Sequence, residues 1–428
     1  MEAMDCEVLV IGGGPAGSTV ATMLAERGRD VVMVEREEHP RFHIGESLLP
    51  VNMEIIRRLG VEDAVIAAGT FKPGAEFVDD ATGLRSAFRF KDSMNQAATV
   101  AYQVPRAPFD KILFDNARDK GVSTYEQVRV TDVLLPEEGQ RGWVTAECRG
   151  KPCAYAPRYV VDATGRDTLI ANKFGLKQAN KQNSTAAVYA HWTGVRMQMD
   201  PADDAGFITI HLVEDGWFWM IPLPGDVMSV GFVGNSDVFK NREGTAQALY
   251  LDRLARSPTI AARMVGAERV GDIHSAGNYS YRCTRGSGDG WMMVGDAFGF
   301  LDPVFSSGVL LAMSSAELAA GVIDTWFDNP GRAAREARRM ERTMCTAMDN
   351  LGWLVTRINT PVLREMFMSP SNKLRMRDGL VALLAGNLEI DRKLKLPVLA
   401  FKSVYYALTY LRRYGVRAEP EPRMLPAE

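Results

Sequence analysis

The first fifty residues alternate between apolar runs and small or polar residues in a pattern that predicts a strand, a turn, a helix and a second strand. Residues 8–11 are a β-branched apolar run, residues 12–17 are rich in glycine, and residues 18–27 carry apolar residues at helical spacing. Gly28 is placed to end the helix, and residues 30–34 form the next apolar run. This order is typical of a nucleotide-binding βαβ unit.

The glycine-rich turn has the spacing of a dinucleotide-binding fingerprint. Gly12 permits a tight turn, Gly14 lets the backbone approach a pyrophosphate, and Gly17 allows the helix and strand to pack closely. The amino end of the helix also attracts phosphate groups. Glu35 ends the second strand 18 residues beyond Gly17, near the distance expected for an acidic residue that binds a ribose hydroxyl. A glycine turn with a purely structural role is the alternative.

Later segments predict a sheet and then a helical region. Alternating apolar and polar residues over 186–195, 207–213 and 228–234 are typical of an antiparallel sheet, in which a lone strand histidine such as His191 is expected to be structural. Residues 402–414 predict a last amphipathic helix with a basic edge. Beyond about residue 335, the residues with helical spacing are Met340, Met344, Met348 and Leu351.

Composition and charge narrow the class of protein. The chain has 428 residues, 46% hydrophobic and 24% charged, which suits about two or three globular domains. Its 50 Lys and Arg against 53 Asp and Glu lack the basic excess of nucleic-acid-binding proteins. The five scattered cysteines lack metal-ligand spacing, and from the sequence we expect neither a signal peptide nor a membrane-spanning stretch, which needs about 18 apolar residues. We therefore expect a cytoplasmic protein without a metal, a nucleic-acid partner or a membrane anchor.

The fingerprint does not separate NAD from FAD, but three later segments favour FAD. The first, residues 104–117, contains Arg106, Phe109 and Asp110, and its arginine precedes an amphipathic helix. The second, residues 159–166, reads YVVDATGR, and the third, residues 291–300, runs from an apolar strand into a Gly-Asp turn. Together they resemble the glutathione-reductase-type FAD fold of aromatic hydroxylases and flavin-dependent halogenases, over about the first 330 residues. The resemblance implies that Asp296 of the turn contacts the ribityl or pyrophosphate part of FAD. A helix N-cap is the alternative role, and both can hold together.

Two motifs narrow the resemblance to the halogenases. Residues 217–222, WFWMIP, match their W-x-W-x-I-P pattern, and the residues from Phe298 to Gly308 fit their F-x4-P-x2-S-x-G pattern. On spacing alone, Trp217 and Trp219 share one face of a strand, where core aromatics are the alternative interpretation.

The loop 302–308 precedes a helix-like run, so its exposed backbone N–H groups suit an anion. In the halogenases that the chain resembles, this loop holds chloride beside the flavin. The resemblance therefore implies a catalytic position for Ser306 and halide binding at Ser307 and Gly308.

A lysine and a short acidic segment complete the resemblance. An isolated lysine is usually a solvated surface charge. Lys72, however, lies shortly before a Gly-Ala pair, where the halogenases carry their essential lysine. Residues 45–50, GESLLP, also resemble the family's G-E-S segment, in which Glu46 and Ser47 adjoin the flavin.

The resemblance implies a reaction as well as a fold. Reduced FAD, supplied by a separate flavin reductase, would react with oxygen to a C4a-hydroperoxide, and chloride or bromide would take its distal oxygen to give hypohalous acid. The acid would travel to Lys72 while Trp217 and Trp219 keep the aromatic substrate from the hydroperoxide. Lys72 would then either form a haloamine, which needs a lowered pKa, or polarise the acid through a hydrogen bond in its charged form.

One difference from the halogenases that the chain resembles bears on its substrate. Halogenases of free tryptophan have a glutamate where this chain has Phe305. The resemblance therefore favours a pyrrolyl group tethered to an acyl or peptidyl carrier protein, or a phenol, and leaves the ring-deprotonating base unidentified. The alternatives are an aromatic monooxygenase that consumes NAD(P)H, an isoprenoid reductase on the same fold, and a non-enzymatic flavin-binding module.

The predicted fold class is α/β: a glutathione-reductase-type FAD-binding fold with an antiparallel sheet as substrate domain and a C-terminal helical region. The FAD-binding domain is expected to be discontinuous, over 1–75, 101–167 and 270–335. The substrate domain takes 76–100 and 168–269, and the helical region takes 336–428. The residues expected to bind FAD are Gly12, Gly14, Ala16, Gly17, Glu35, Arg36, Glu46, Ser47, Arg106, Asp296 and Pro303.

Overall fold

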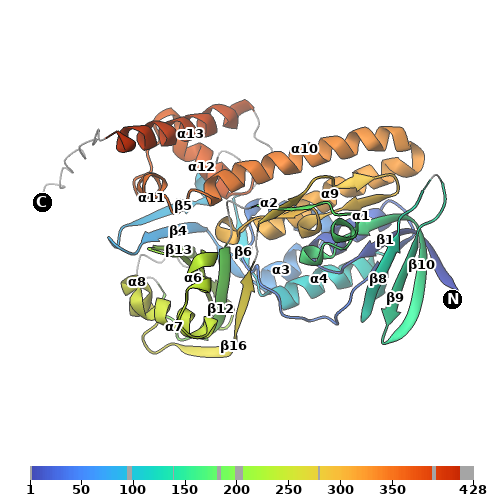
Figure 1. The fold of residues 1–428 in the computed structure, drawn as a ribbon, viewed down its shortest axis with the longest axis horizontal. Coiled ribbons are helices and arrows are strands. Elements are labelled where there is room, and N and C mark those ends of the chain that lie inside the picture. Colours follow the sequence, from blue (N-terminus) through green and yellow to red (C-terminus); the bar gives the residue numbers. More distant parts are fainter. Residues whose placement is uncertain are drawn as a thin grey trace, which may run out of the picture.

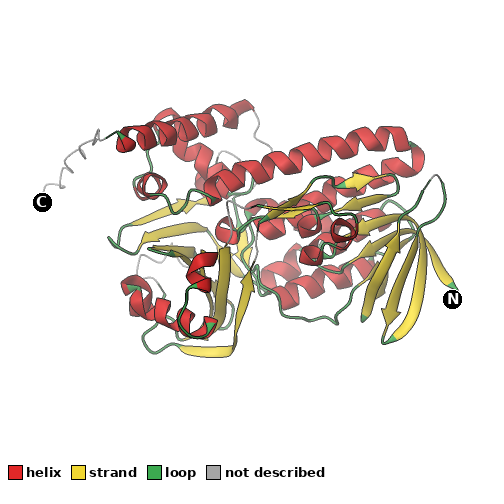
Figure 2. Ribbon diagram, in the orientation of Figure 1, coloured by secondary structure: helices red, strands yellow, loops and turns green. Residues whose placement is uncertain are grey.

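The computed structural model describes residues 2–93, 99–137, 139–180, 185–197, 206–277, 280–387 and 392–414. Two sheets and a layer of helices make up an elongated molecule (Figures 1 and 2). One sheet carries the N-terminus and the other lies at the opposite end. Along the top of this view, residues 330–355 run towards the first sheet, and residues 361–413 lie over the second.

The first sheet has eight strands, in which β1 pairs in parallel with β2 on one side and with β10 on the other. The predicted strand, turn, helix and strand are confirmed, although β1 starts earlier than expected because its first residues pair with β10. In chain order the strands are β1 (Ala3–Ile11), β2 (Val31–Val34), β7 (Ser123–Tyr125), β8 (Val128–Leu134), β9 (Trp143–Cys148), β10 (Lys151–Asp162), β18 (Ser287–Gly288) and β19 (Trp291–Met293).

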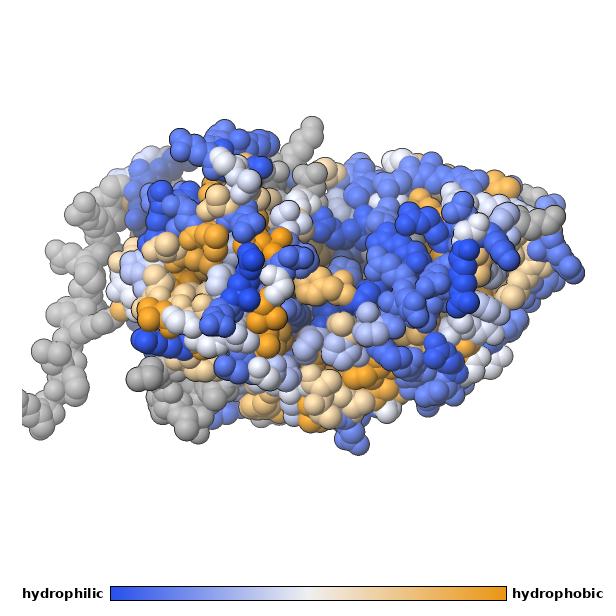
Figure 3. Space-filling model, turned by 90° about the horizontal axis from the view of Figure 1, so that it is seen from below, coloured by the Kyte–Doolittle hydropathy of each residue, from blue (hydrophilic) through white to orange (hydrophobic). Residues whose placement is uncertain are grey.

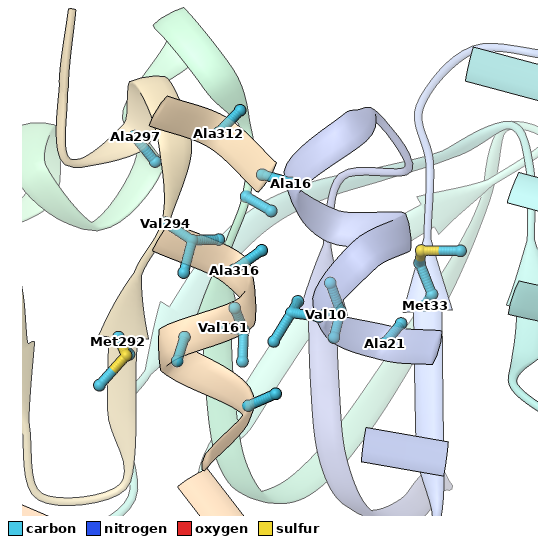
Figure 4. Close-up of a cluster of buried hydrophobic side chains, with 14 of the residues drawn as sticks. Val10, Ala16, Ala21, Met33, Val161, Met292, Val294, Ala297, Ala312 and Ala316 are labelled. Carbon is cyan, nitrogen blue, oxygen red and sulfur yellow. The ribbon is translucent and has the colours of Figure 1, made fainter. Parts of the chain in front are cut away.

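Helices with small residues cover this sheet, and their side chains fill one core. In Figure 4, Ala16, Ala21, Ala312 and Ala316 of the covering helices lie beside apolar side chains of β1, β2, β10 and β19, and these small residues let helix and sheet backbones come close together. The helices around this sheet are α1 (Pro15–Ala25), α2 (Pro50–Leu59), α3 (Glu62–Ala67), α4 (Arg106–Asp119), α5 (Leu169–Lys173), α9 (Ser307–Asp328) and α10 (Pro330–Val355).

The helix α9 corrects one expectation from the sequence. By length and composition alone it qualifies as a membrane-spanning helix, the one such candidate among the described residues. Two-thirds of its most apolar window is buried, because the helix packs between α1 and α10. Its apolar character therefore serves the protein core in this structure.

The second sheet has seven strands in the order β16-β12-β15-β14-β13-β4-β5. The pairing is antiparallel, as predicted, except that β4 and β13 run parallel. Its strands are β4 (Gly74–Asp79), β5 (Arg85–Arg89), β12 (Thr185–Thr193), β13 (Ile208–Val213), β14 (Gly216–Leu223), β15 (Val227–Asn235) and β16 (Glu268–Gly277).

Side chains alternate across this sheet, so each face has its own helical cover. Three short helices cover one face: α6 (Ser236–Lys240), α7 (Ala246–Arg256) and α8 (Pro258–Arg263). Three C-terminal helices pack against the other: α11 (Pro361–Met368), α12 (Met376–Leu384) and α13 (Arg392–Arg413). The predicted last helix is therefore longer at its start than expected, and the predicted methionine face of α10 is buried.

Two small sheets complete the strand topology of the described residues. Strands β3 (Thr70–Lys72) and β6 (Ala101–Gln103) form an antiparallel pair. The other sheet consists of β11 (Lys177–Ala179), β17 (Tyr281–Cys283) and β20 (Gly299–Phe300).

Seen from below in Figure 3, hydrophilic side chains cover most of the face over the first sheet, and more apolar side chains are visible over the second.

Candidate active site

A cavity of about 660 Å³ extends from the glycine-rich turn after β1 to the second sheet. Its size and mixed apolar and polar lining suit a large cofactor or ligand. The sequence-predicted residues that line it are Gly12, Gly14, Ala16, Glu35, Arg36, Glu46, Ser47, Arg106, Trp217, Trp219, Asp296, Ser306 and Gly308. Four others, Gly17, Lys72, Pro303 and Ser307, are not among the described lining residues.

The glycines at one end of the cavity form a close-packed cradle. Gly12 has a φ of +109°, and a Cβ on it would overlap the carbonyl of Ala163. A Cβ on Gly17 would overlap the carbonyl oxygen of Gly12. The turn therefore needs glycine at both positions, and Gly17 acts through packing rather than by facing the cavity.

Glu35 holds the end of β2 beside this cradle. Its carboxylate accepts the backbone N–H of Gly13 at 2.8 Å and lies 3.3 Å from the guanidinium of Arg41. Burial alone would raise the pKa of Glu35, but Arg41 and the N–H groups of Glu37 and Gly13 lower it. Glu35 is therefore a preorganised, ionised acceptor at the cavity wall. Arg36 pairs instead with Asp167 at the half-exposed rim.

A buried ion-pair network links Arg106 to the same wall. Arg106 donates to both carboxylate oxygens of Asp110, at 2.8 and 3.0 Å, and to the carbonyl of Ile44. Arg41 approaches the same carboxylate at 3.2 Å. Asp110 belongs to the segment 104–117 that favoured FAD in the sequence, but its pairing with Arg106 was not predicted, although their four-residue spacing on a helix was the available signal. Arg41 was not included among the predicted site residues.

Asp296 lies in the turn between β19 and α9 and faces the cavity. Burial raises its pKa to about 6, although Arg106 and Arg166 oppose the shift. Asp296 does not have the alternative role of an N-cap. Val294 is the N-cap residue of this 3-10 turn, and no side chain caps the turn.

Trp217 and Trp219 form the far wall of the cavity. Both are buried on one face of β14, as their spacing predicted, with ring centroids 5.9 Å apart. The Nε1–H of Trp219 donates to Ser229 Oγ at 3.2 Å. Its indole covers Gly231 of β15, a residue that the sequence analysis missed.

The loop before α9 brings its backbone to the cavity. Ser306 is the N-cap residue in a left-handed conformation with φ of +56°, and Ser307 begins the helix. Ser306 and Gly308 line the cavity, whereas Ser307 is buried beside it. The amino end of a long helix thus faces the space between the two sheets. Pro303 belongs to the preceding 3-10 turn, but its side chain lies outside the described part of the structure.

Lys72 is buried, with 1% of its surface exposed, on the short strand β3. Its Nζ donates to the carbonyl of Leu48 at 2.8 Å and lies 5.3 Å from the ring centroid of Phe90. Burial lowers its pKa to about 7. The lysine is therefore shielded from solvent, and its hydrogen-bond partner Leu48 directly follows Glu46 and Ser47, which line the cavity.

Glu46 has a partner that the sequence did not reveal. Its Oε1 lies 2.8 Å from Nε2 of His191 on β12, and its buried Oε2 has no hydrogen-bond partner among the described residues. The hydrogen bond to Glu46 raises the pKa of His191, against the effect of burial. His191 was expected to be a structural strand residue, but the structure pairs it with a residue of the site.

Comparison with known proteins identifies relatives of this arrangement. Residues 5–323 match the family of FAD binding domains. A tryptophan 2-halogenase of Chondromyces crocatus is 35% identical, over 74% of this chain and 60% of its own. A 1H-pyrrole-2-carbonyl-[peptidyl-carrier protein] brominase of Pseudoalteromonas luteoviolacea (strain 2ta16) is 33% identical, over 76% of this chain and 79% of its own.

The overall fold also matches solved structures along nearly the whole chain. A flavoprotein/dehydrogenase of Cytophaga hutchinsonii superposes with a TM-score of 0.85 at 29% identity, covering 96% of this chain and 100% of the other. The C-terminal helices therefore belong to the shared architecture. In the sequence matches, this chain spans about 60 to 67% of the length of the first six curated relatives.

Proposed function

The chain belongs to the flavin-dependent halogenase family, and from this premise we propose that it halogenates an electron-rich aromatic ring with FADH2, oxygen and chloride or bromide. One observation carries the proposal. A single cavity joins a dinucleotide cradle to the amino end of α9 and to a wall of two tryptophans, and a solvent-shielded lysine lies beside it. A protein that only binds flavin needs neither the wall of two tryptophans nor the shielded lysine.

The residues at the cradle fit FAD. The glycine turn leaves no room for side chains, Glu35 offers an ionised acceptor suited to ribose hydroxyls, and Arg106 with Asp296 lines the neighbouring wall. These residues would hold the cofactor. When bound and reduced, FAD with oxygen supplies the two-electron oxidising power that converts halide to hypohalous acid.

The protein's own groups divide the remaining work. Backbone N–H groups at Ser307 and Gly308 would bind the halide, since the amino end of a helix favours an anion. Trp217 and Trp219 would separate the aromatic substrate from the flavin, because their two large buried rings lie side by side in the cavity wall.

Lys72 would direct the oxidised halogen. With its pKa lowered to about 7 by burial, both its neutral amine and its ammonium are populated near neutral pH. The neutral form suits a haloamine and the charged form suits polarisation of hypohalous acid, so both routes stay open for this residue.

For the substrate we favour a pyrrolyl group tethered to a carrier protein, with a phenol as the second choice. Phe305 packs in the core against Phe77 and Phe367, each at 6.4 Å between ring centroids, so the position before Ser306 holds a buried apolar ring and no carboxylate. The relative from Pseudoalteromonas luteoviolacea is named for a pyrrole on a peptidyl carrier protein.

The helix α13 supports a protein-borne substrate. Its residues Arg392–Arg413 include six Lys or Arg and no Asp or Glu. Leu396, Leu399, Tyr406 and Tyr410 are exposed and recur at heptad-like spacing along one stripe. Exposed aromatic residues flanked by basic ones suit an acidic protein surface, and we propose this face as the docking site of the carrier.

One assay tests the class of reaction. A flavin reductase would supply FADH2 in the presence of oxygen and either halide, with a panel of phenols and carrier-bound pyrroles. We expect a halogenated product from the wild type and almost none from Lys72→Met, while both oxidise FADH2. A hydroxylated product that forms without halide would instead identify a monooxygenase, and substrate reduction without oxygen would identify a reductase.

A further inference from the structure

The short strand pair β3–β6 shows how the cavity is connected to Lys72. Lys72 is paired with Ala101, and Thr70 with Gln103. Cross-strand partners and residues two apart share a face, so the side chains of Lys72 and Gln103 lie on the same side of this pair. Phe71 and Tyr102 lie on the opposite side, with their rings 5.8 Å apart.

Ser47 extends this inner face towards the cavity. An isolated bridge joins Ser47 to Gln103, so its side chain shares the face of Gln103 and Lys72. Ser47 also lines the cavity, and its neighbour Leu48 supplies the carbonyl that accepts from Lys72. Ser47 is therefore the residue of this face that touches both the cavity and the lysine's surroundings.

Two polar atoms on this face are buried and have no partner in the part of the chain that the structure describes. They are Ser47 Oγ and Gln103 Oε1, on side chains that are 5% and 0% exposed. The amide nitrogen of Gln103 is occupied, because it donates to the carbonyl of Gly206. Burying an unpaired hydroxyl and an unpaired carbonyl costs free energy, and one small ligand with a donor and an acceptor would satisfy both atoms on this face.

We propose that Ser47 and Gln103 form a binding site for hypohalous acid next to Lys72. The inference rests on the proposed function. Hypohalous acid is small and uncharged, with one O–H donor and an oxygen that accepts. Gln103 Oε1 can only accept, so it takes the O–H, while the Ser47 hydroxyl donates to the acid's oxygen. No bond is made or broken at this site; it holds the acid within reach of the lysine.

The test compares the hypohalous acid that escapes into solution with the hypohalous acid that halogenates the substrate. Ser47→Ala and Gln103→Met are assayed with FADH2, oxygen, bromide, the best substrate of the panel, and monochlorodimedone as a trap for free hypobromous acid. The measured quantity is the ratio of halogenated substrate to halogenated trap. We expect each variant to lower this ratio about tenfold, the factor of one lost hydrogen bond of ordinary strength.

Thr19→Val is the matched control. The Thr19 hydroxyl is also buried without a partner among the described residues, but it lies on α1 and does not line the cavity. The control should keep the wild-type ratio. Ser47→Ala removes only an unpartnered hydroxyl, so it should fold at least as stably as the wild type even where Gln103→Met does not.

Each other outcome is assigned in advance. An unchanged ratio in either folded variant overturns the inference, and so does a loss of FAD affinity in Ser47→Ala that leaves the ratio intact, since Ser47 would then serve the cofactor. Product formation by Lys72→Met would contradict the proposed function itself. Independently of activity, a crystal structure should show one ordered water bonded to both Ser47 Oγ and Gln103 Oε1; protein partners for both atoms would refute the site.

Discussion

The indole of Trp219 lies directly over Gly231 on the neighbouring strand, so that a Cβ at Gly231 would fall within the ring. The wall of the cavity thus depends on a residue that carries no side chain. Because both residues belong to central strands of the second sheet, the ring could yield only towards the cavity or by bending the sheet.

Gly231→Ala should therefore destabilise the protein by about 1–3 kcal/mol, the usual cost of overpacking a core. It should also reduce halogenation by moving Trp219. Urea denaturation measures the first effect and product yield the second. Gly277→Ala on the edge strand β16 is the control, since a Cβ there would meet Ala186 at an ordinary 4.0 Å. Equal stability of the two variants would contradict the packing argument.

Glu35→Ala should weaken FAD binding by about tenfold to a hundredfold, because it removes a charged acceptor and leaves the Gly13 N–H without its partner, although Arg41 keeps its contact with Asp110. Quenching of FAD fluorescence on binding gives the dissociation constant. Glu38→Gln, an exposed neighbour that does not line the cavity, serves as control and should bind FAD as the wild type does.

The buried amine of Lys72 should make stability depend on pH. Its folded pKa of about 7 lies below the unfolded value, so between these two pKa values the unfolded chain binds more protons and the free energy of unfolding rises with pH. Relative to Lys72→Met, wild-type stability should rise from about pH 7 to about pH 10, by up to about 1.4 kcal/mol per pH unit. Parallel curves for the two proteins in urea denaturation would show that the amine keeps its ordinary pKa.

The hydrogen bond between His191 and Glu46 should give stability the opposite pH dependence to that of Lys72. Since the folded pKa of His191 is raised, its contribution is complete below the unfolded pKa of about 6.5 and is lost as pH rises through the folded value. His191→Asn should remove this component of the stability profile. If the stability of His191→Asn fell with the same slope across that range as the wild type, the hydrogen bond to Glu46 would not be coupled to protonation.

Reversing charge on α13 should weaken use of a carrier-bound substrate alone. Lys395→Glu with Arg413→Glu should raise KM for the carrier-bound pyrrole several-fold and leave kcat and the turnover of a free phenol unchanged. Lys240→Glu, exposed on α6, is the matched control. A rise in KM that persists in high salt would argue against an electrostatic docking surface.

Local features of this chain were readable from the sequence because they depend on neighbours along it. The glycine turn, the shared face of Trp217 and Trp219, and the helix after Ser306 each follow from the spacing of a few adjacent residues. The order of the motifs along the chain likewise indicated the FAD fold that the family match confirms.

Contacts between distant segments were decided only by the tertiary structure. The partner of Glu46 lies 145 residues away, and Arg41 meets Asp110 across 69 residues. Burial of Lys72 likewise depends on how β3, the segment at Leu48 and the turn at Phe90 pack together. Spacing along a chain specifies which side of a strand or helix a residue occupies, whereas the pKa of a lysine and the partner of a carboxylate depend on the packing of elements that no local pattern relates.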